Sequence, residues 1–375
     1  MATAAANIPS LSVAILAITR HGAGLALEIL KKLPGSVCYV PSRLGCPATE
    51  NMVVFEKLEE AVRHAWSNHH ALVCIMASGI VVRHLAPLVE HKALDPAVIV
   101  MDEQGQFVVS LLSGHLGGAN ALARRIARMT GGQAVITTAS DVRGKPAIDL
   151  IARDANLAIE NSAMVARLAR AFLEEETIWI FDPYEHLKPH LQQEGNVLWT
   201  DDVLSDGRMP GPGEKGHSKE QLNVLRDGQS RVGIWVSEQL PPTDLCCLIL
   251  RPRNLVVGLG CNRGTPTNEM LALIQRVFKD ANLSLLSIRN LASIDLKADE
   301  QAILETGRRF DRPIAFYCKA DLEQVSVPNP SNLVKVHVGV PSVCEATALL
   351  SAQQGKIIVP KKKSANVTVA VVRVS

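Results

Sequence analysis

Three short turns hold the residue types best suited to ligand binding and proton transfer. In each turn, small residues lie between an apolar run and the start of a helical pattern, at residues 77–79, 113–118 and 258–265. At the carboxyl ends of parallel strands such turns expose backbone N–H groups, and the dipole of the following helix favours anions. Glycine there lets a large ligand approach the backbone. The turns predict a ligand with several carboxylates or phosphates. The alternative at each turn is that the glycines only allow a tight bend.

The second turn carries the leading candidate for a general base. His115 lies inside the glycine-rich run, where its imidazole can face a ligand, and histidine exchanges protons readily near neutral pH. Ser113 beside it can orient a water or a carboxylate. The alternatives are local: His115 can bond the backbone at the start of a helix, and Ser113 can close the turn.

Other residues of the first two turns are candidates for substrate binding. In the second turn, backbone N–H groups and one side-chain amide can meet an oxyanion or a carboxylate: Gly114, Gly117, Gly118 and Asn120. In the first turn, the candidates are Ser78, Gly79 and Arg83. An arginine can pair with a carboxylate through two hydrogen bonds, although a solvated Arg83 is the alternative.

The third turn resembles a nucleotide-binding loop only in part. Its glycines follow the spacing G-x-G-x-x-x-G, which departs from the dinucleotide fingerprint, so a nicotinamide-dependent reductase is disfavoured. Thr265 before Pro266 is typical of a helix N-cap. The substrate-binding candidates of this turn are Gly260, Arg263, Gly264 and Thr265.

A fourth helix start lies near the C-terminus. Ser342 and Glu345 have the S-x-x-E spacing of a capping box ahead of an apolar run. The same turn can also offer N–H groups to a carboxylate, so both residues are candidates for substrate binding as well.

The sequence does not predict a metal site in the protein. Its eight cysteines are scattered, with no C-x-x-C and no zinc-type Cys/His spacing. Most of them lie in apolar runs, where cysteine behaves as a small hydrophobic residue. We therefore expect structural free thiols and no cluster of histidines and carboxylates around a metal.

Strands that alternate with helices predict an α/β fold with mostly parallel sheets. We expect two α/β domains, at residues 1–145 and 251–375, joined by a smaller α/β middle region at 146–250 with a mobile loop at 205–218. In the first domain, a hairpin is expected between 98–101 and 107–111, and a helix from about 117 to 130. In the last domain, we expect strands at 255–259, 283–288, 313–318, 333–338 and 367–374. Asp295 and Lys297 are expected in an extended stretch, and Lys361–Lys363 in a solvated loop.

Composition excludes several classes of protein. The net charge of +2 leaves no electrostatic footprint for nucleic acid, and 4% aromatic residues argue against a protein that stacks single-stranded bases. Residues 11–18 are too few to cross a bilayer, and no positive region of a signal peptide precedes them. We therefore expect a cytoplasmic protein that binds neither nucleic acid nor membrane.

Several long runs resemble one family. GLGCNRGTPTNEM, LASIDLKADE, FYCKADLEQV and VGVPSVCEATALLSA, with the closing TVAVVRV, are similar to the C-terminal domain of the CbiG family, the cobalt-precorrin-5A hydrolases of anaerobic cobalamin (vitamin B12) biosynthesis. The run that begins ASGIVVRHLAPLVEHKALDPAV and ends GGANALARRIA resembles the N-terminal domain of the family. The resemblance covers most of residues 11–175 and 252–375, and the middle region resembles the family only weakly, as a variable connector.

The resemblance implies an enzyme. Its substrate would be a cobalt tetrapyrrole with acetate and propionate arms and a δ-lactone on ring A. The enzyme would open the lactone and break a carbon–carbon bond to release acetaldehyde, giving cobalt-precorrin-5B. No cofactor is expected, because the substrate carries the cobalt and its conjugated ring can accept electrons. The alternative is a non-catalytic tetrapyrrole carrier or assembly partner of the same pathway. A homodimer or a contact with other pathway enzymes is the expected association.

Overall fold

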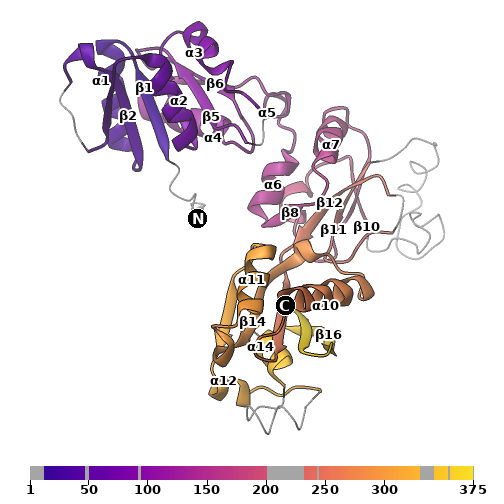
Figure 1. Ribbon diagram of the computed structural model, residues 1–375. Coiled ribbons are helices and arrows are strands. Elements are labelled where there is room, and N and C mark those ends of the chain that lie inside the picture. Colours follow the sequence, from indigo (N-terminus) through magenta and orange to yellow (C-terminus); the bar gives the residue numbers. More distant parts are fainter. Residues whose placement is uncertain are drawn as a thin grey trace. The chain divides into compact units, whose positions relative to one another are not determined.

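The protein has an α/β fold, as the sequence predicts. The computed structural model describes residues 12–46, 50–91, 94–200, 232–242, 245–329, 342–353 and 355–374, and the statements that follow concern these residues. The chain forms two compact units, Met1–Leu150 and Ile151–Ser375. The first unit contains one sheet and the second contains two (Figure 1).

The sheet of the first unit has seven strands. In spatial order they are β3 (Met52–Phe55), β2 (Ser36–Pro41), β1 (Val13–Ala17), β4 (Ala71–Ile75), β5 (Ala97–Met101), β6 (Phe107–Leu112) and β7 (Gln133–Val135). The strands β1 to β5 are parallel to one another. β6 is antiparallel to β5, which confirms the predicted hairpin, and β7 is parallel to β6.

Helices cover both faces of this sheet. The helices of the first unit are α1 (Arg20–Lys32), α2 (Leu58–Asn68), α3 (Ser78–Leu85), α4 (Ala119–Thr130) and the short α5 (Ala139–Arg143). The short helix α6 (Ile148–Asp154) crosses the boundary between the two units at Leu150. Side chains alternate between the faces of a strand, so Ile15 of β1 packs with α1 and α4 while Leu16 packs with α2 and α3. The predicted helix over 117–130 is confirmed as α4, and Gly131 ends it in the left-handed conformation that glycine favours.

The hairpin reverses the direction of the chain at β6. Its tip is held by Asp102, whose carboxylate accepts hydrogen bonds from the backbone N–H groups of Gln104, Gln106 and Phe107 at 2.9, 3.3 and 2.7 Å. Leu112 at the end of β6 pairs with Val98 near the start of β5. The carboxyl end of β6 therefore lies at the edge of the sheet where β1 to β5 begin.

The second unit begins with the middle sheet. Its strands, in spatial order, are β10 (Val197–Thr200), β9 (Ile178–Phe181), β11 (Gly233–Val236), β12 (Cys247–Pro252) and β8 (Leu157–Ile159). Four of these strands are parallel, and β8 is antiparallel to β12. The associated helices are α7 (Ala163–Leu173) and α8 (Lys188–Leu191). The loop predicted at 205–218 lies outside the described residues.

The last sheet also has five strands. In spatial order they are β15 (Ile314–Tyr317), β14 (Ile288–Ile294), β13 (Leu255–Cys261), β17 (Val367–Arg373) and β16 (Lys356–Lys363). β13, β14 and β15 are parallel to one another, β17 is antiparallel to β13, and β16 is antiparallel to β17. Its helices are α10 (Thr267–Asp280), α11 (Gln301–Phe310), α12 (Lys319–Glu323) and α14 (Val343–Ser351). α10 and α11 pack on the face that contains Val257, and α14 packs on the face that contains Val256.

Three expectations for this sheet are wrong. The strand expected at 283–288 is mostly a 3-10 turn at Leu285–Ser287, and the strand itself follows at Ile288–Ile294. The extended stretch expected around Asp295 and Lys297 is another 3-10 turn, so the two side chains do not alternate along a strand. The lysine run ends the edge strand β16 and is not a loop. Lysine side chains on an edge strand discourage its pairing with a strand of another chain. The strand expected at 333–338 lies outside the described residues.

All eight cysteines are free thiols. Burial raises the pKa of Cys38 to about 11, and burial raises the pKa of Cys74 and of Cys247 to about 12. Thiols of this kind are unreactive, as expected for cysteines that only fill space. In the part of the chain that the structure describes, no helix is long and apolar enough to cross a membrane.

Candidate functional site

The turn after β6 is closed by its own backbone. Ser113 has a φ of 56°, its hydroxyl donates to the carbonyl oxygen of Asp95 at 3.0 Å, and its own carbonyl accepts from the N–H of Ala119 at 3.2 Å. Gly117 passes so close that a β-carbon there would lie 2.4 Å from the β-carbon of Ser113. Glycine is therefore needed at Gly117 for the bend, and the hydroxyl of Ser113 ties the turn to the segment before β5.

The backbone amides at the start of α4 already have partners. The N–H of Gly118 donates to the carbonyl of His115 at 2.9 Å, and the N–H of Asn120 donates to that of Gly114 at 3.0 Å. The N–H predicted to be free at Gly118 is therefore paired within the turn. This amide is therefore not free to donate to an anion in this arrangement. Gly114, Gly117 and Gly118 stay candidates for contact with a substrate.

His115 is partly exposed and lies in a cluster of polar side chains. Its Nε2 is 3.3 Å from Oδ2 of Asp141 and 3.2 Å from Oγ of Ser140, and its Nδ1 is 3.9 Å from Oδ2 of Asp149. Asp141 and Ser140 belong to α5, which follows β7, and β7 lies beside β6 in the sheet. The two neighbouring strand ends therefore bring the imidazole and its partners together.

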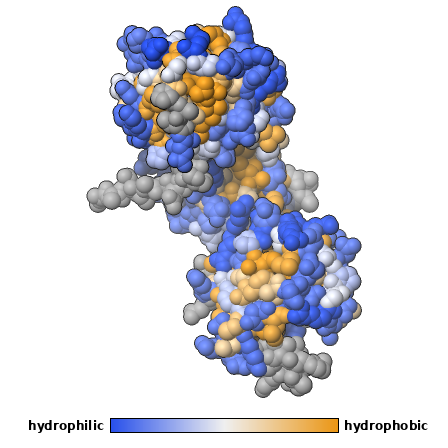
Figure 2. Space-filling model, turned by 60° about the vertical axis from the view of Figure 1, so that its left-hand side comes forward, coloured by the Kyte–Doolittle hydropathy of each residue, from blue (hydrophilic) through white to orange (hydrophobic). Residues whose placement is uncertain are grey.

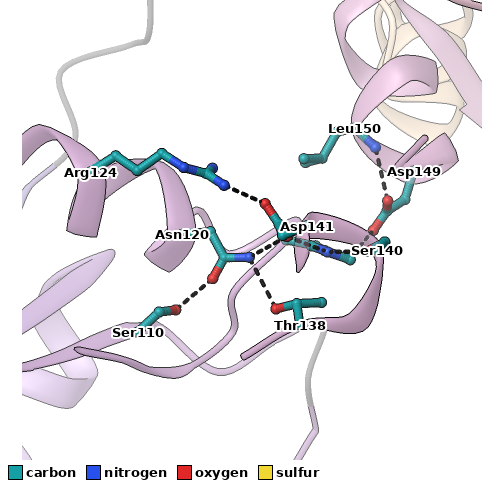
Figure 3. A network of polar contacts seen from close by, with 9 residues as sticks. Ser110, Asn120, Arg124, Thr138, Ser140, Asp141, Asp149 and Leu150 are labelled. Carbon is teal, nitrogen blue, oxygen red and sulfur yellow. Dashed lines mark hydrogen bonds and ion pairs between the residues drawn. The ribbon is translucent and has the colours of Figure 1, made fainter. Parts of the chain in front are cut away.

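Asp141 is held as a carboxylate by three side chains, of which Arg124 and Asn120 are labelled in Figure 3. Arg124 donates to its Oδ1 at 2.6 Å, Asn120 donates to its Oδ2 at 2.8 Å, and His115 lies on the same Oδ2. Burial raises the pKa of the Asp141 carboxyl, but the hydrogen bond and charge of Arg124, with those of His115, outweigh burial and hold the pKa below its ordinary value. The group is thus ionised at neutral pH.

Asn120 is buried and its amide is fully used inside the protein. Its Oδ1 accepts from the hydroxyl of Ser110 at 2.7 Å, and its Nδ2 also contacts the hydroxyl of Thr138 at 3.2 Å (Figure 3). A β-carbon at Gly114 would lie 2.7 Å from this Oδ1, so glycine leaves the space that Asn120 occupies. Asn120 therefore supports Asp141, and its amide is not directed at a substrate in this arrangement.

The first turn lies at the opposite edge of the same sheet. Ser78 and Gly79 start α3 directly after β4, whose last residue Ile75 pairs with Met101 at the end of β5. Since the hairpin places His115 near the start of β5, the two turns are on the order of 13 Å apart along the strands at about 3.3 Å per residue. The structure does not bring them together. Arg83 is exposed and donates to the carbonyl of Gly79 at 3.0 Å.

The third turn contains a self-paired arginine. Arg263 donates to Oδ1 of Asp299 at 2.5 Å and to the carbonyl of Leu296 at 2.6 Å. The N–H of Gly264 donates to Oε1 of Glu300 at 3.0 Å. The carboxylates that this turn binds are therefore those of Asp299 and Glu300, from another segment of the same protein. A substrate carboxylate would have to compete with Asp299, which is exposed.

The helix start at Thr265 differs from the expected one. The N-cap of α10 is Pro266, and no side chain caps it. The hydroxyl of Thr265 instead donates to the carbonyl of Asn262 at 2.7 Å, which stabilises the turn before the helix. The predicted capping role of Thr265 is wrong by one position.

The glycines of β13 make room for α14. A β-carbon at Gly258 would lie 1.8 Å from the carbonyl oxygen of Cys344, and one at Gly260 would lie 2.7 Å from the hydroxyl of Thr368. Gly258 thus permits close packing of helix on strand, a structural role. The N-terminus of α14 lies beside the same strand end as Arg263, because Val343 is within 4.0 Å of the position of a Gly260 β-carbon.

The capping box expected at α14 does not form. Ser342 is the N-cap residue, but its side chain makes no capping hydrogen bond and contacts Sγ of Cys344 at 3.8 Å. Glu345 is fully buried, and its carboxylate accepts from the backbone N–H groups of Asn329 and Lys361 at 3.2 and 3.0 Å. Glu345 therefore ties two distant segments together instead of capping its own helix.

Sequence reasoning missed three members of the His115 cluster: Ser140, Asp141 and Asp149. The signal for two of them is the run Thr137-Thr138-Ala139-Ser140-Asp141, which follows an apolar strand and starts a helix. It has the same strand–turn–helix pattern as the predicted turns but contains no glycine. Over the described residues, no group of three or more His, Cys, Asp or Glu side chains is arranged to hold a metal ion.

Comparison with known proteins gives a consistent result over the chain. Three family models match it: "Cobalamin synthesis G N-terminal" at residues 60–141, "Cobalamin biosynthesis central region" at 146–252 and "Cobalamin synthesis G C-terminus" at 255–372. The middle region, where the resemblance in the sequence is weak, thus has its own match in the family.

Curated relatives match nearly the whole chain. A protein of Priestia megaterium named cobalt-precorrin-5A hydrolase is 29% identical over 96% of this chain and 94% of its own length. One of the same name from Salmonella typhimurium is 30% identical over 96% of each chain. A Sinorhizobium protein named CobE is 41% identical over 31% of this chain and 77% of its own length. The order of the three matched regions and the full-length similarity identify the chain as a member of the CbiG family of cobalamin-synthesis proteins.

Proposed function

We propose that this protein hydrolyses the ring-A δ-lactone of cobalt-precorrin-5A and releases acetaldehyde, giving cobalt-precorrin-5B. The observation that carries the proposal is the full-length similarity to two proteins named cobalt-precorrin-5A hydrolase. The arrangement around His115 supports it, because a partly exposed imidazole with a carboxylate partner is suited to activating water. The cytoplasmic location and the absence of a separate cofactor stay predictions.

The first step of the proposed reaction is hydrolysis of a cyclic ester. His115 takes a proton from water, and the water oxygen adds to the lactone carbonyl carbon. The ester C–O bond then breaks, the departing oxygen receives the proton from His115, and the products are a carboxylic acid and a free hydroxyl. This sequence needs one base that becomes an acid and no redox partner.

The second step breaks a carbon–carbon bond. The freed hydroxyl loses its proton and becomes the carbonyl of acetaldehyde, while the bond between the two-carbon unit and the macrocycle breaks. The electron pair of that bond passes into the conjugated macrocycle, which takes up a proton. The cobalt enters with the substrate and acts as part of it.

Apolar side chains lie exposed next to the His115 cluster. Leu116 follows His115 and is 46% exposed, and Val142 follows Asp141 and is 71% exposed. Leu94, next to the Asp95 that Ser113 contacts, is 78% exposed. Figure 2 shows that apolar residues lie exposed among hydrophilic ones on the face in view. A flat apolar ring with carboxylate arms has the chemistry to cover such side chains, which supports a tetrapyrrole substrate.

Charged replacements of these side chains are expected to weaken substrate binding. The double variant Leu116→Asp/Val142→Asp removes apolar contact area and adds negative charge opposite an acidic ligand, so we expect affinity for the pigment to fall by about tenfold to hundredfold. Titration followed by the visible absorption of the cobalt pigment measures it. The matched control is Leu286→Asp, since Leu286 is 39% exposed in the second unit. An equal loss in both variants would contradict the assignment.

Anaerobic incubation of the purified protein with cobalt-precorrin-5A tests the proposed function. We expect one acetaldehyde per pigment consumed, measured with a coupled aldehyde assay, and a mass change of the pigment equal to water gained and acetaldehyde lost. A protein that retains the pigment without releasing aldehyde would be a carrier, and that result would overturn the proposal.

A further inference from the structure

We infer that Asp141 is a positioning residue that holds the proton of His115 on Nε2, so that Nδ1 is the nitrogen that accepts the proton of the attacking water. The inference rests on the proposed function for the identity of the reaction. The position of the proton on the ring can be measured without any substrate.

The argument starts from what Asp141 can do. An ionised carboxylate only accepts hydrogen bonds, so its contact with Nε2 of His115 at 3.3 Å is attractive only when Nε2 carries hydrogen. Arg124 and Asn120, which both donate to Asp141, keep the carboxylate ionised and fixed in place. Nε2 is thus a donor, and the lone pair of the neutral ring lies on Nδ1.

Ser140 fits the same assignment. Its hydroxyl oxygen lies 3.2 Å from Nε2 and can share the Nε2 hydrogen with Asp141 as a second acceptor. The alternative, a hydroxyl that donates to an unprotonated Nε2, would leave the carboxylate of Asp141 facing a lone pair. Ser140 therefore does not serve as a nucleophile activated by His115 in this arrangement.

The supports of Asp141 are themselves buried or paired. Asn120 is 4% exposed, and its amide is oriented by the hydroxyls of Ser110 and Thr138 on two neighbouring elements. A fixed acceptor selects one tautomer of a histidine more strongly than a mobile one, because the hydrogen bond survives only in one ring state.

Asp149 lies on the other side of the ring. Its Oδ2 is 3.9 Å from Nδ1, which is too long for a hydrogen bond but close enough for charge to act. When Nδ1 takes a proton from water, the resulting imidazolium lies between the carboxylates of Asp141 and Asp149. The proton then passes from Nδ1 to the oxygen that leaves the lactone, and Asp141 is never protonated.

Nitrogen NMR of the substrate-free protein tests the inference directly. In ¹⁵N-labelled protein at a pH where His115 is neutral, we expect the pattern of two-bond ¹H–¹⁵N couplings that is typical of the Nε2–H tautomer. The signal is assigned among the eleven histidines by its loss in His115→Gln. In Asp141→Asn the pattern should shift toward the Nδ1–H tautomer or an average of both, because the asparagine amide can donate to Nε2.

Activity gives the second measurement. Asp141→Asn should lower kcat by about 10²- to 10³-fold, with pigment affinity changed less than about threefold. The matched control Asp154→Asn removes an exposed carboxylate, 58% accessible, whose ion-pair partner among the described residues is its neighbour Arg153, and should change neither value. Circular dichroism checks that each variant is folded. If Asp141→Asn does not fold, Arg124→Met is measured in its place. This variant keeps Asp141 but removes the hydrogen bond from Arg124, and it should give an intermediate loss of kcat.

Two results would overturn the inference: an Nδ1–H tautomer in the unmodified protein, or an Asp141→Asn protein with unchanged tautomer and turnover. Both can be told apart from failure of the proposed function. If the unmodified protein releases no acetaldehyde while the NMR pattern is as expected, the proposed reaction fails and the hydrogen-bond assignment stands.

Discussion

Replacing His115 with alanine is expected to lower the turnover of cobalt-precorrin-5A by about 10²- to 10⁴-fold, the usual contribution of a general base. Pigment affinity should change little, because the exposed apolar side chains next to the cluster are untouched. Acetaldehyde release and the visible absorption of bound pigment measure the two quantities separately. The expectation follows from the place of the imidazole, which is partly exposed while its partners Asp141 and Ser140 are more buried.

The control for this variant is His190→Ala, which removes an exposed imidazole from α8. It should leave turnover unchanged. His115→Gln adds a second comparison, since glutamine keeps polar contact with the cluster but cannot act as a base at neutral pH. Turnover that is unchanged in both His115 variants would remove this residue from the mechanism. Loss of pigment binding in both would make it a binding residue instead.

Gly258→Ala is expected to destabilise the second unit by at least about 3 kcal/mol, the upper part of the range for an overfilled core. The added methyl group would lie 1.8 Å from the carbonyl oxygen of Cys344 and 2.9 Å from the β-carbon of Ala348. The first of these is backbone, so α14 would have to move off the sheet. Thermal unfolding followed by circular dichroism measures the loss as a lower unfolding temperature of the second unit.

A glycine in open space provides the comparison. A β-carbon at Gly195, in the same unit, would meet nothing within 4 Å. Gly195→Ala should therefore change the free energy of unfolding by no more than about 0.5 kcal/mol. If Gly258→Ala unfolds at the temperature of the unmodified protein, the close packing of α14 on β13 cannot be as described.

The elements with a strong local signal are predictable from the sequence. The apolar spacing of residues 119–129 and the glycine that follows define α4 without reference to the rest of the chain. The failures come where neighbours decide the outcome. Leu285 and Leu286 have the composition of a strand, yet they form a 3-10 turn because Ser284 caps it with its hydroxyl and the pairing with β13 begins only at Ile288.

The candidate site is predictable only in part, for the same reason. His115 stands out because it lies within a run of glycines, but its partners come from another strand end, and only the pairing of β6 with β7 places them together. The expectation that the turn at residues 113–118 lies at the ligand-binding edge of the sheet assumes that its strand runs parallel to its neighbours. The predicted hairpin already contradicts that assumption, because a reversed strand carries its carboxyl end to the other side of the sheet.

The hairpin tip held by Asp102 sets the pairing register of β6, the strand that leads to His115. β6 pairs with β5 residue by residue from that tip, apart from one irregularity between Val98 and Ile99. One residue gained or lost in the paired part of the tip would displace the later side chains by one place and turn them to the opposite face of the sheet. The imidazole would then leave its aspartate although nothing near it had changed. Insertions and deletions in this loop should accordingly be poorly tolerated, in contrast to the freedom usual for surface connections.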